Sequence, residues 1–204
     1  MFENIIKNVH NRHPLIHCIT NYVSINDCAN IVLACGGAPI MAEDINEVSQ
    51  ITSICQGLDI NIGMLNDNKL SSMLKAGATA NELGIPVILD PVGAGSSDYR
   101  IKAVQNLMSN VQFGVIRGNV SEIKAIAAKQ GIHNIAAGVY ETMQKNKSAM
   151  GVEAGIADKI TDDNIKEMAD FINKLSQKTG AVIAVTGGID MVADENRVYA
   201  IRNG

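Results

Sequence analysis

The sequence predicts an α/β protein in which a mostly parallel central sheet carries helices on both faces. Two observations support this fold class. Short apolar runs, typical of strands inside a parallel sheet, alternate along the chain with longer segments whose apolar residues recur at helical spacing. Several of these runs also stop at a polar residue or a glycine, as strands of such a sheet do where a ligand binds beyond their carboxyl ends.

Composition narrows the possible partners. The 204 residues are 47% hydrophobic, which suits one domain with a sizeable core, so we expect a single domain over residues 1–204. The net charge is −4 and the basic residues are not clustered, which argues against nucleic acid. No apolar run approaches the roughly 20 residues that cross a bilayer, and the N-terminus lacks the apolar core of a signal peptide. The four cysteines form no CxxC pair. We therefore expect a cytoplasmic protein with buried free thiols that binds small molecules, and neither nucleic acid nor membrane.

The first expected strand spans residues 15–20 and ends just before Asn21, whose side-chain amide could face a ligand. His13 and His17 are four residues apart, a spacing that would suggest a metal-binding pair on a helix. Pro14 and the β-branched neighbours favour a strand instead, so we do not expect a zinc site here.

The next segments alternate between helix and strand. Ser24, followed by Asp27, resembles a capping box at the start of a helix that ends at Gly36. A short strand over residues 39–42 then contains Met41. This methionine either fills a gap in the core or contacts an apolar ring of a ligand, and the residues alone leave both roles open.

A further helix is expected from Asp44, and a further strand over residues 58–63. Gly63 closes that strand and would let a ligand approach the backbone. After a helix that begins near Asn66, the chain reaches the apolar run 87–89, which we expect to be buried on both faces of the sheet.

Asp90 follows that run directly and precedes a loop with two glycines, Gly93 and Gly95, and a helix that begins near Ser97. An acid at the carboxyl end of a parallel strand can reach a metal ion or a phosphoryl group. The loop is not a dinucleotide motif, because Asp98 stands where the third glycine should be, and the sequence has neither a GxxxxGK[ST] nor a GxSxG motif. Asp90 is therefore the first candidate for chemistry.

A second candidate region lies around Arg117, which ends an apolar strand just before a helix N-terminus. That combination suits a bound phosphate. Asn119 and Glu122 fit an N-cap with its reciprocal acid, and this structural role alone could explain Glu122. Thr186 ends the apolar strand 181–186 and places a hydroxyl at the same edge of the sheet.

The remaining signals complete the alternating pattern. Thr161 is expected to cap a long helix, and residues 189–193 and 197–201 are expected to form a hairpin. Residues 131–157 carry few clear signals.

Taken together, these segments resemble the hydroxyethylthiazole kinase family of the ribokinase-like superfamily. The resemblance implies a three-layer sandwich and a homotrimer with the site between subunits. It also implies transfer of the terminal phosphoryl of ATP, with Mg²⁺, to the hydroxyl of 4-methyl-5-(2-hydroxyethyl)thiazole in thiamine biosynthesis or salvage. The matching stretches run in family order over nearly the whole chain: residues 19–23, 38–42, 61–65, 89–95, 115–119 with Glu122, and 185–187.

The resemblance also implies roles for the candidate residues. Asn21, Met41 and Gly63 would lie around the thiazole, and in a trimer Asn21 and Met41 could serve a neighbouring subunit's ATP. Three residues would contact ATP, and two acids would act near the Mg²⁺ and the phosphates as catalytic and metal-binding residues. These are Arg117, Asn119 and Thr186 for ATP, and Asp90 and Glu122 for the acids.

Two departures from the family pattern bear on activity. The segment 132–150 is longer than the family pattern suggests. The family also carries a C-terminal Gly-Thr-Gly-Cys motif whose cysteine is thought to act as the base, and the 204 residues do not contain it, so none of the four cysteines can take that role. We therefore expect the kinase domain to lack its C-terminal part here and to be nearly inactive on its own. The alternatives are a catalytically silent thiazole- or nucleotide-binding protein and a related small-alcohol kinase such as a hydroxymethylpyrimidine kinase.

Overall fold

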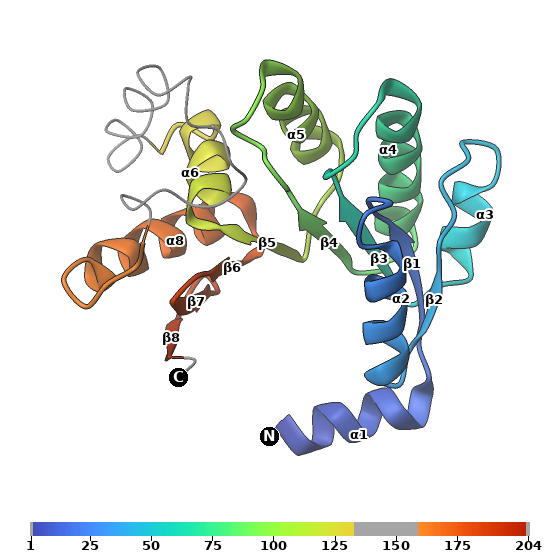
Figure 1. The fold of residues 1–204 in the computed structure, drawn as a ribbon, viewed down its shortest axis with the longest axis horizontal. Helices are drawn as coiled ribbons and strands as arrows, with labels where there is room; N and C mark the ends of the chain where they lie inside the picture. The colour runs from blue at the N-terminus through green and yellow to red at the C-terminus, as the bar shows by residue number, and fades with distance from the viewer. Residues whose placement is uncertain (1, 133–158, 203–204) are drawn as a thin grey trace. The chain divides into compact units, whose positions relative to one another are not determined.

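The computed structural model describes residues 2–132 and 159–202. Strands alternate with helices along almost the whole described chain, and only the last three strands follow one another without a helix between them (Figure 1). The elements in chain order are α1 (Phe2–Arg12), β1 (Leu15–Ile19), α2 (Ile25–Ala34), β2 (Ala38–Ile40), α3 (Val48–Ser53), β3 (Gly57–Asn61), α4 (Asp67–Glu82), β4 (Val87–Asp90), α5 (Asp98–Asn110), β5 (Val115–Asn119), α6 (Val120–Lys129), α8 (Ile165–Thr179), β6 (Val182–Thr186), β7 (Ile189–Ala193) and β8 (Val198–Arg202).

The chain forms two compact units. The first comprises Met1–Leu89 with Ser109–Gln112, and the second comprises Asp90–Met108 with Phe113–Gly204. The expectation of one domain over residues 1–204 stays a prediction.

In the first unit, β1 lies between β2 and β3, and both pairings are parallel. Successive residues of a strand point to opposite faces of a sheet, and the contacts of β1 show a helix on each face. His17 hydrogen-bonds to Thr52 of α3 on one face, whereas Thr20, just past the strand, contacts Cys28 of α2 on the other. Helices α3 and α4 lie side by side (Figure 1). The expected α/β arrangement with helices on both faces is thus confirmed in this unit.

Strand β4 corrects one expectation from the sequence. Val87 and Leu89 are almost fully buried, but Ile88 between them is 40% exposed. Its side chain points to the opposite face from its two neighbours, and the residues that the structure describes bury only the face that carries Val87 and Leu89. The unbroken apolar run correctly predicted a strand, but the prediction of burial on both faces was wrong.

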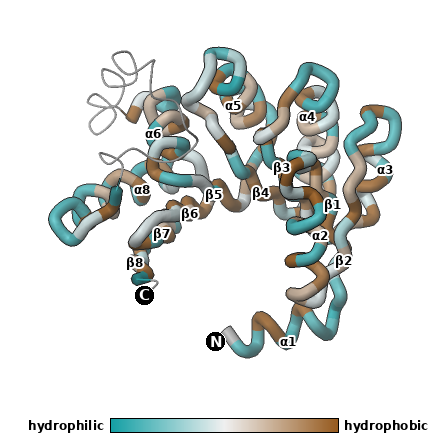
Figure 2. Tube along the Cα trace, in the orientation of Figure 1, coloured by the Kyte–Doolittle hydropathy of each residue, from teal (hydrophilic) through white to brown (hydrophobic). Residues whose placement is uncertain are grey.

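In the second unit, β5 and β6 are parallel, and β6, β7 and β8 form an antiparallel ribbon that includes the expected hairpin. The buried residues of these strands share one face, because Ile116 is paired with Ile183, and Ile183 with Ala193. Helices α6 and α8 pack against these strands. Hydrophobic residues concentrate along the strands, whereas the helices are mixed (Figure 2).

Several boundaries differ from the sequence-based expectations, and the reasons are local. The helix expected from Asp44 begins only at Val48, because the Asp44 side chain closes a turn onto the backbone N–H and the amide of Asn46. The helix expected from Thr161 begins at Ile165, because the Asn164 side chain reaches back to the Thr161 N–H and closes another turn.

Other features at the amino-terminal end were missed or only half right. Helix α1 had not been predicted. Ser24 is the N-cap of α2, but its side chain makes no capping hydrogen bond, so the expected capping box does not form.

The four cysteines are free thiols, as expected. Cys18 and Cys55 are buried, and burial, followed by the charge of Asp59, raises the pKa of Cys18 to about 12. Cys35 is exposed, so the expectation of burial was wrong for that residue, which lies just past the end of α2. Within residues 2–132 and 159–202, no helix combines the length and apolar character that a membrane crossing requires.

Candidate functional site

Three candidate residues of the first unit lie just past the carboxyl ends of strands: Asn21 after β1, Met41 after β2 and Gly63 after β3. Two of them meet through Asn61, the last residue of β3, and we refer to Asn21, Asn61 and Gly63 as the amide cluster. The Asn21 amide donates to Asn61 Oδ1 at 3.3 Å, and the Gly63 backbone N–H donates to the same oxygen at 2.8 Å. Asn21 Oδ1 in turn accepts from the backbone N–H and the hydroxyl of Ser24. These bonds fix both side-chain amides at the edge of the sheet.

Gly63 is required by this packing. A Cβ atom at position 63 would stand 2.9 Å from Asn61 Oδ1 and 3.1 Å from the Asn21 amide nitrogen. Any side chain here would therefore push the two asparagines apart. The glycine thus allows the side chains of Asn21 and Asn61 to lie close to its backbone, and the expected approach of a ligand stays a prediction.

Met41 directly follows β2, and it is half-buried rather than part of the core. The segment after it is held by His17. His17 Nε2 lies 2.8 Å from the carbonyl oxygen of Ala42, and its Nδ1 lies 2.9 Å from the Thr52 hydroxyl. Because a carbonyl can only accept, Nε2 carries a proton, and in the neutral imidazole Nδ1 accepts from the hydroxyl. Burial lowers the pKa of His17 and so favours this neutral form.

Acidic pH should weaken this arrangement. Burial lowers the pKa of His17 below its ordinary value, and the opposing effects of the Ala42 hydrogen bond and the Glu47 charge do not cancel that shift. Above the ordinary value of 6.5 the imidazole is neutral in both the folded and unfolded states. Below it the unfolded state takes up a proton first, so the free energy of unfolding should fall by up to about 1.4 kcal/mol per pH unit.

Chemical denaturation of the protein between pH 7.5 and pH 5 measures this slope. His17→Gln is the control, because it removes the titrating group and should show a shallower decline over that interval. Equal slopes in the two proteins would contradict the assignment of the effect to His17.

The second unit contains the other candidates, which we refer to as the acid–arginine cluster: Asp90, Arg117, Asn119, Glu122 and Thr186. Arg117 Nη1 lies 3.5 Å from Asp90 Oδ2, so the two residues are brought together. Asp90 ends β4 as expected, but Arg117 lies in the middle of β5, so the expectation that it ends its strand was wrong. The Arg117 side chain is 53% exposed and that of Asp90 19%. An ion pair this long and this accessible contributes little to stability. Its components can therefore reorganise around a ligand at low cost.

Glu122 is buried, and each of its carboxylate oxygens accepts a backbone N–H. Oε2 accepts from Asn119 at 2.8 Å, while Asn119 Oδ1 accepts from the Glu122 N–H at 2.9 Å, which completes the expected capping box of α6. Oε1 accepts from the N–H of Gly93 at 2.9 Å. Gly93 has a φ of +64°, a conformation that suits glycine. Glu122 thus joins the N-terminus of α6 to the glycine loop after Asp90.

The neighbouring strand completes the cluster. Asn119 and Thr186 are partners in the parallel register of β5 and β6, and the Thr186 hydroxyl donates to the Gly118 carbonyl at 3.4 Å. A Cβ atom on Gly118 would stand 2.9 Å from Glu122 Oε2. Glycine at position 118 is therefore what allows the buried acid to approach the strand.

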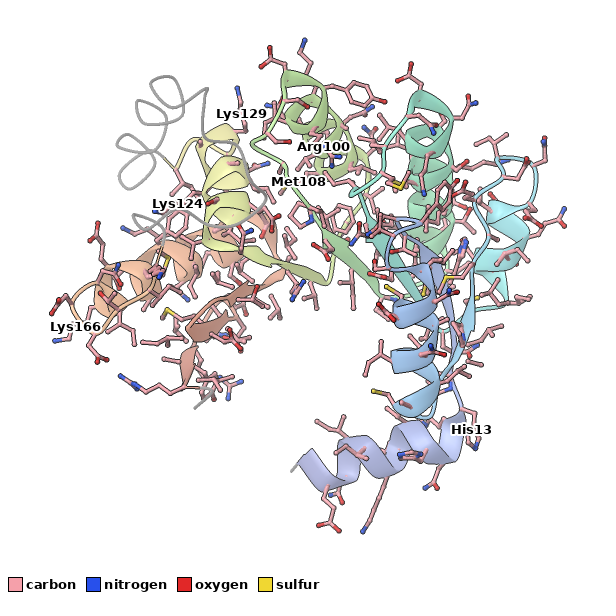
Figure 3. All side chains as sticks on the ribbon, viewed as in Figure 1. His13, Arg100, Met108, Lys124, Lys129 and Lys166 are labelled. Atoms are coloured by element: carbon pink, nitrogen blue, oxygen red, sulfur yellow. The ribbon has the colours of Figure 1, made fainter. Side chains whose placement is uncertain are left out.

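The sequence did not point to two residues that hold these sites together, Asn61 and Arg100. Asn61 had been noted only as part of a strand, although it joins Asn21 to Gly63. Arg100, labelled in Figure 3 near the start of α5, donates from Nη1 to the Val92 carbonyl at 2.8 Å and so holds the glycine loop. An asparagine at a strand end was a usable signal for Asn61, but no local signal pointed to Arg100.

The acid–arginine cluster suits a hard cation that also contacts phosphates. Mg²⁺ prefers oxygen ligands and commonly binds through one or two carboxylates, water and phosphate oxygens. Asp90 offers such a carboxylate at a strand end. Both Glu122 oxygens already accept amide hydrogens, so Glu122 suits contact with the cation through water better than direct ligation.

Comparison with known proteins gives a consistent result. Residues 6–162 match the model of the hydroxyethylthiazole kinase family. The chain is 52% identical over 204 residues to a hydroxyethylthiazole kinase of Clostridium acetobutylicum, covering all of this chain and 69% of that protein. It is 45% identical over 204 residues to one of Desulfovibrio desulfuricans, covering all of this chain and 66% of the relative.

Solved structures agree with this result. A hydroxyethylthiazole kinase from Pyrococcus horikoshii OT3 superposes with a TM-score of 0.80 at 31% identity, covering 98% of this chain and 66% of that one. An ancestral vitamin kinase shares the fold at 14% identity, with a TM-score of 0.54 over 93% of this chain and 85% of its own. The expected fold class is confirmed. The chain spans about two thirds of the length of the curated relatives that it matches.

Proposed function

This chain belongs to the hydroxyethylthiazole kinase family, and from that premise we propose that it transfers the terminal phosphoryl group of ATP to the hydroxyl of 4-methyl-5-(2-hydroxyethyl)thiazole, in thiamine biosynthesis or salvage. The observation that carries the proposal is the 52% identity over all 204 residues to a relative that bears the family name. Two clusters of residues support it. The amide cluster is neutral, like the thiazole, whereas the acid–arginine cluster carries charges that suit the phosphates of ATP.

The neutral thiazole is assigned to the first unit. Met41 supplies an apolar, polarisable side chain for the ring. Asn21 and Gly63 stand in the amide cluster, where bonds to Asn61 hold the side-chain amide and the backbone in place. An apolar contact with a few fixed polar groups is the usual composition of a site for a small organic molecule.

ATP is assigned to the second unit. Arg117 provides a guanidinium for the phosphates, and Asn119 and Thr186 add polar groups on adjacent strands. Asp90 would hold the Mg²⁺ directly, and Glu122 would contact it through water. When bound, the cation neutralises the charge that develops on the transferred phosphoryl group.

In the reaction, the substrate hydroxyl oxygen forms a bond to the terminal phosphorus of ATP while the bond from that phosphorus to the bridging oxygen breaks. ADP leaves with the electron pair of that bond, and the hydroxyl proton is released. Because such transfers depend mainly on positioning and charge stabilisation, the protein groups above hold the substrates and balance charge. Glu122 contributes by joining Gly93 to the α6 cap, which fixes the backbone beside Asp90.

The proposal also includes a homotrimer and a cytoplasmic location. Free thiols at all four cysteines are consistent with a reducing compartment. The trimer rests on the family resemblance alone.

The experiment that tests the function compares two alcohols. With ATP and Mg²⁺, the purified product of the whole gene should release ADP with hydroxyethylthiazole at a kcat/KM at least about 10²-fold above that with hydroxymethylpyrimidine. The reverse preference would favour a hydroxymethylpyrimidine kinase. Binding of thiazole without any ADP release would favour a silent binding protein.

Replacing Met41 by alanine tests the thiazole assignment. Because Met41 is half-buried, the variant should raise the KM for thiazole several-fold while costing less stability than the roughly 2–5 kcal/mol of a buried methionine. Met73→Ala is the matched control, since Met73 is fully buried in α4 and should lose stability with an unaltered KM. A large fall in Tm for Met41→Ala with an unchanged KM would show that Met41 has a structural role and does not contact the thiazole.

A further inference from the structure

A buried lysine lies beside the segments to which the thiazole is assigned. Lys69 is in the first turn of α4, and its side chain is only 3% exposed. An ammonium group is rarely buried unless its hydrogens are all satisfied, because removing it from water is costly. The partners of Lys69 therefore indicate what the residue does.

Each of the three ammonium hydrogens has an acceptor available. Lys69 Nζ lies 2.5 Å from the carbonyl oxygen of Thr20 and 2.8 Å from Glu43 Oε2. It also lies 4.4 Å from the centroid of the Tyr22 ring, within the range of a cation–π contact. The Tyr22 hydroxyl donates to Glu43 Oε1, so the carboxylate is held from two sides. We refer to Tyr22, Glu43 and Lys69 as the lysine clamp.

The charges of the clamp are mutually consistent. Burial alone would raise the pKa of Glu43, but hydrogen bonds from Lys69 and Tyr22 reverse this effect and lower it below its usual value. The hydrogen bond to Glu43 is the main cause that raises the pKa of Tyr22. Glu43 is thus an ionised partner for the ammonium at neutral pH, and Tyr22 a neutral donor.

The position of the clamp in the chain gives it a function. Thr20 directly precedes Asn21, and Tyr22 directly follows it, so Lys69 contacts the Thr20 backbone on one side of Asn21 and the Tyr22 side chain on the other. Glu43 lies two residues after Met41. Lys69 therefore joins the segment that carries Asn21 to the segment that carries Met41. These two residues are 20 positions apart in the sequence and follow different strands, β1 and β2.

We propose that Lys69 is a positioning residue for the thiazole subsite: through Thr20 and Glu43 it sets the separation between Asn21 and Met41. This inference rests on the proposed function. It adds a residue that lies outside the amide cluster and does not itself contact the substrate.

Lys69→Met tests it, because methionine keeps the long unbranched side chain and removes the charge. The KM for hydroxyethylthiazole should rise by roughly 10-fold, with kcat and the KM for ATP within about twofold, since misplaced binding groups weaken one substrate selectively. If Lys69 only supported the fold, its replacement would change the KM values for thiazole and ATP together, or would change neither of them.

A matched control is available on the same helix. Lys75 of α4 donates to the carbonyl of Ile45, in the loop that also contains Glu43, but this contact is exposed and does not involve residues 20–22. Lys75→Met should therefore leave both KM values unchanged. Equal thiazole KM values for Lys69→Met and Lys75→Met would overturn the inference.

A second variant keeps the test decisive if Lys69→Met does not fold. Glu43 is 39% exposed, so Glu43→Gln weakens the clamp from its accessible side, and it should raise the thiazole KM by about threefold. If Lys69→Met folds, adding Glu43→Gln to it should have almost no further effect, because both changes break the same contact. If the wild type is active and Glu43→Gln has the same thiazole KM, the inference about Lys69 is overturned but the proposed function is not. A wild type that does not phosphorylate the thiazole would overturn the proposed function and this inference with it.

Discussion

Asp90→Asn should lower kcat for thiazole phosphorylation by about 10²–10³-fold, the range seen when one group that stabilises transition-state charge is removed. Asparagine keeps the shape of the side chain and removes the negative charge that would hold Mg²⁺ next to the phosphates. The pair that Asp90 makes with Arg117 is long, at 3.5 Å, and contributes little to folding. The concentration of Mg²⁺ that gives half-maximal rate should rise as well.

The control for this variant is Asp98→Asn. Asp98 is an exposed acid in the first turn of α5, just beyond the same glycine loop, and its replacement should leave kcat unchanged. Steady-state kinetics over a series of Mg²⁺ concentrations gives both quantities. If Asp90→Asn keeps kcat within about threefold of the wild type, Asp90 does not hold the cation and the site has to be placed elsewhere.

Arg117→Ala should weaken ATP binding by about 1.5–3 kcal/mol, the usual contribution of a charge-assisted hydrogen bond, which corresponds to roughly 10- to 150-fold in Kd. Arg117 lies in β5, two residues before the α6 cap Asn119, where its charge and the helix N-terminus favour the same anion. Thiazole affinity should change little, because the thiazole is assigned to residues of the other unit.

Arg197→Ala is the matched control for this prediction. Arg197 is also an exposed arginine that pairs with an aspartate, at 3.4 Å, but it lies in the hairpin between β7 and β8. Calorimetric titration of ATP into both variants should show weaker binding only for Arg117→Ala. An ATP Kd that both substitutions leave unchanged would refute the phosphate assignment.

The order of strands and helices could be predicted because its signals are local. Asn119 caps α6 as expected, and Asn66, near which a helix was expected to begin, caps α4, since an asparagine at an N-cap acts on the amides two or three residues further on. Strand ends were also predictable, because polar residues and glycines interrupt the apolar runs. Asp90 was correctly placed at the end of β4, whereas β5 continues two residues beyond Arg117.

The missed features depend on residues distant in sequence. Lys69 lies 49 residues from Thr20, and nothing in its helix indicates that the ammonium is buried against that carbonyl. His17 similarly acquires its role from Thr52 and Ala42. Exposure of Ile88 could not be read from the run that contains it, because an apolar run gives the strand but not the elements that cover each face.

The family pattern and the structure complement one another at Glu122. The sequence alone left a cap and a site acid equally open. The structure shows the capping box and adds the bond to Gly93, so the cap is confirmed and the acid is tied to the glycine loop. Its role near the phosphates stays a proposal, and both roles are compatible, since a residue that fixes the backbone beside Asp90 affects both folding and catalysis.

The most direct test of the central claim is to identify where the phosphoryl group goes. The purified product of the whole gene is incubated with ATP, Mg²⁺ and hydroxyethylthiazole, and the products are followed by phosphorus NMR and mass spectrometry. The proposed reaction predicts a phosphate ester on the hydroxyethyl oxygen, formed in equal amount with ADP. Formation of ADP with inorganic phosphate in place of the ester, or no ADP at all, would contradict it.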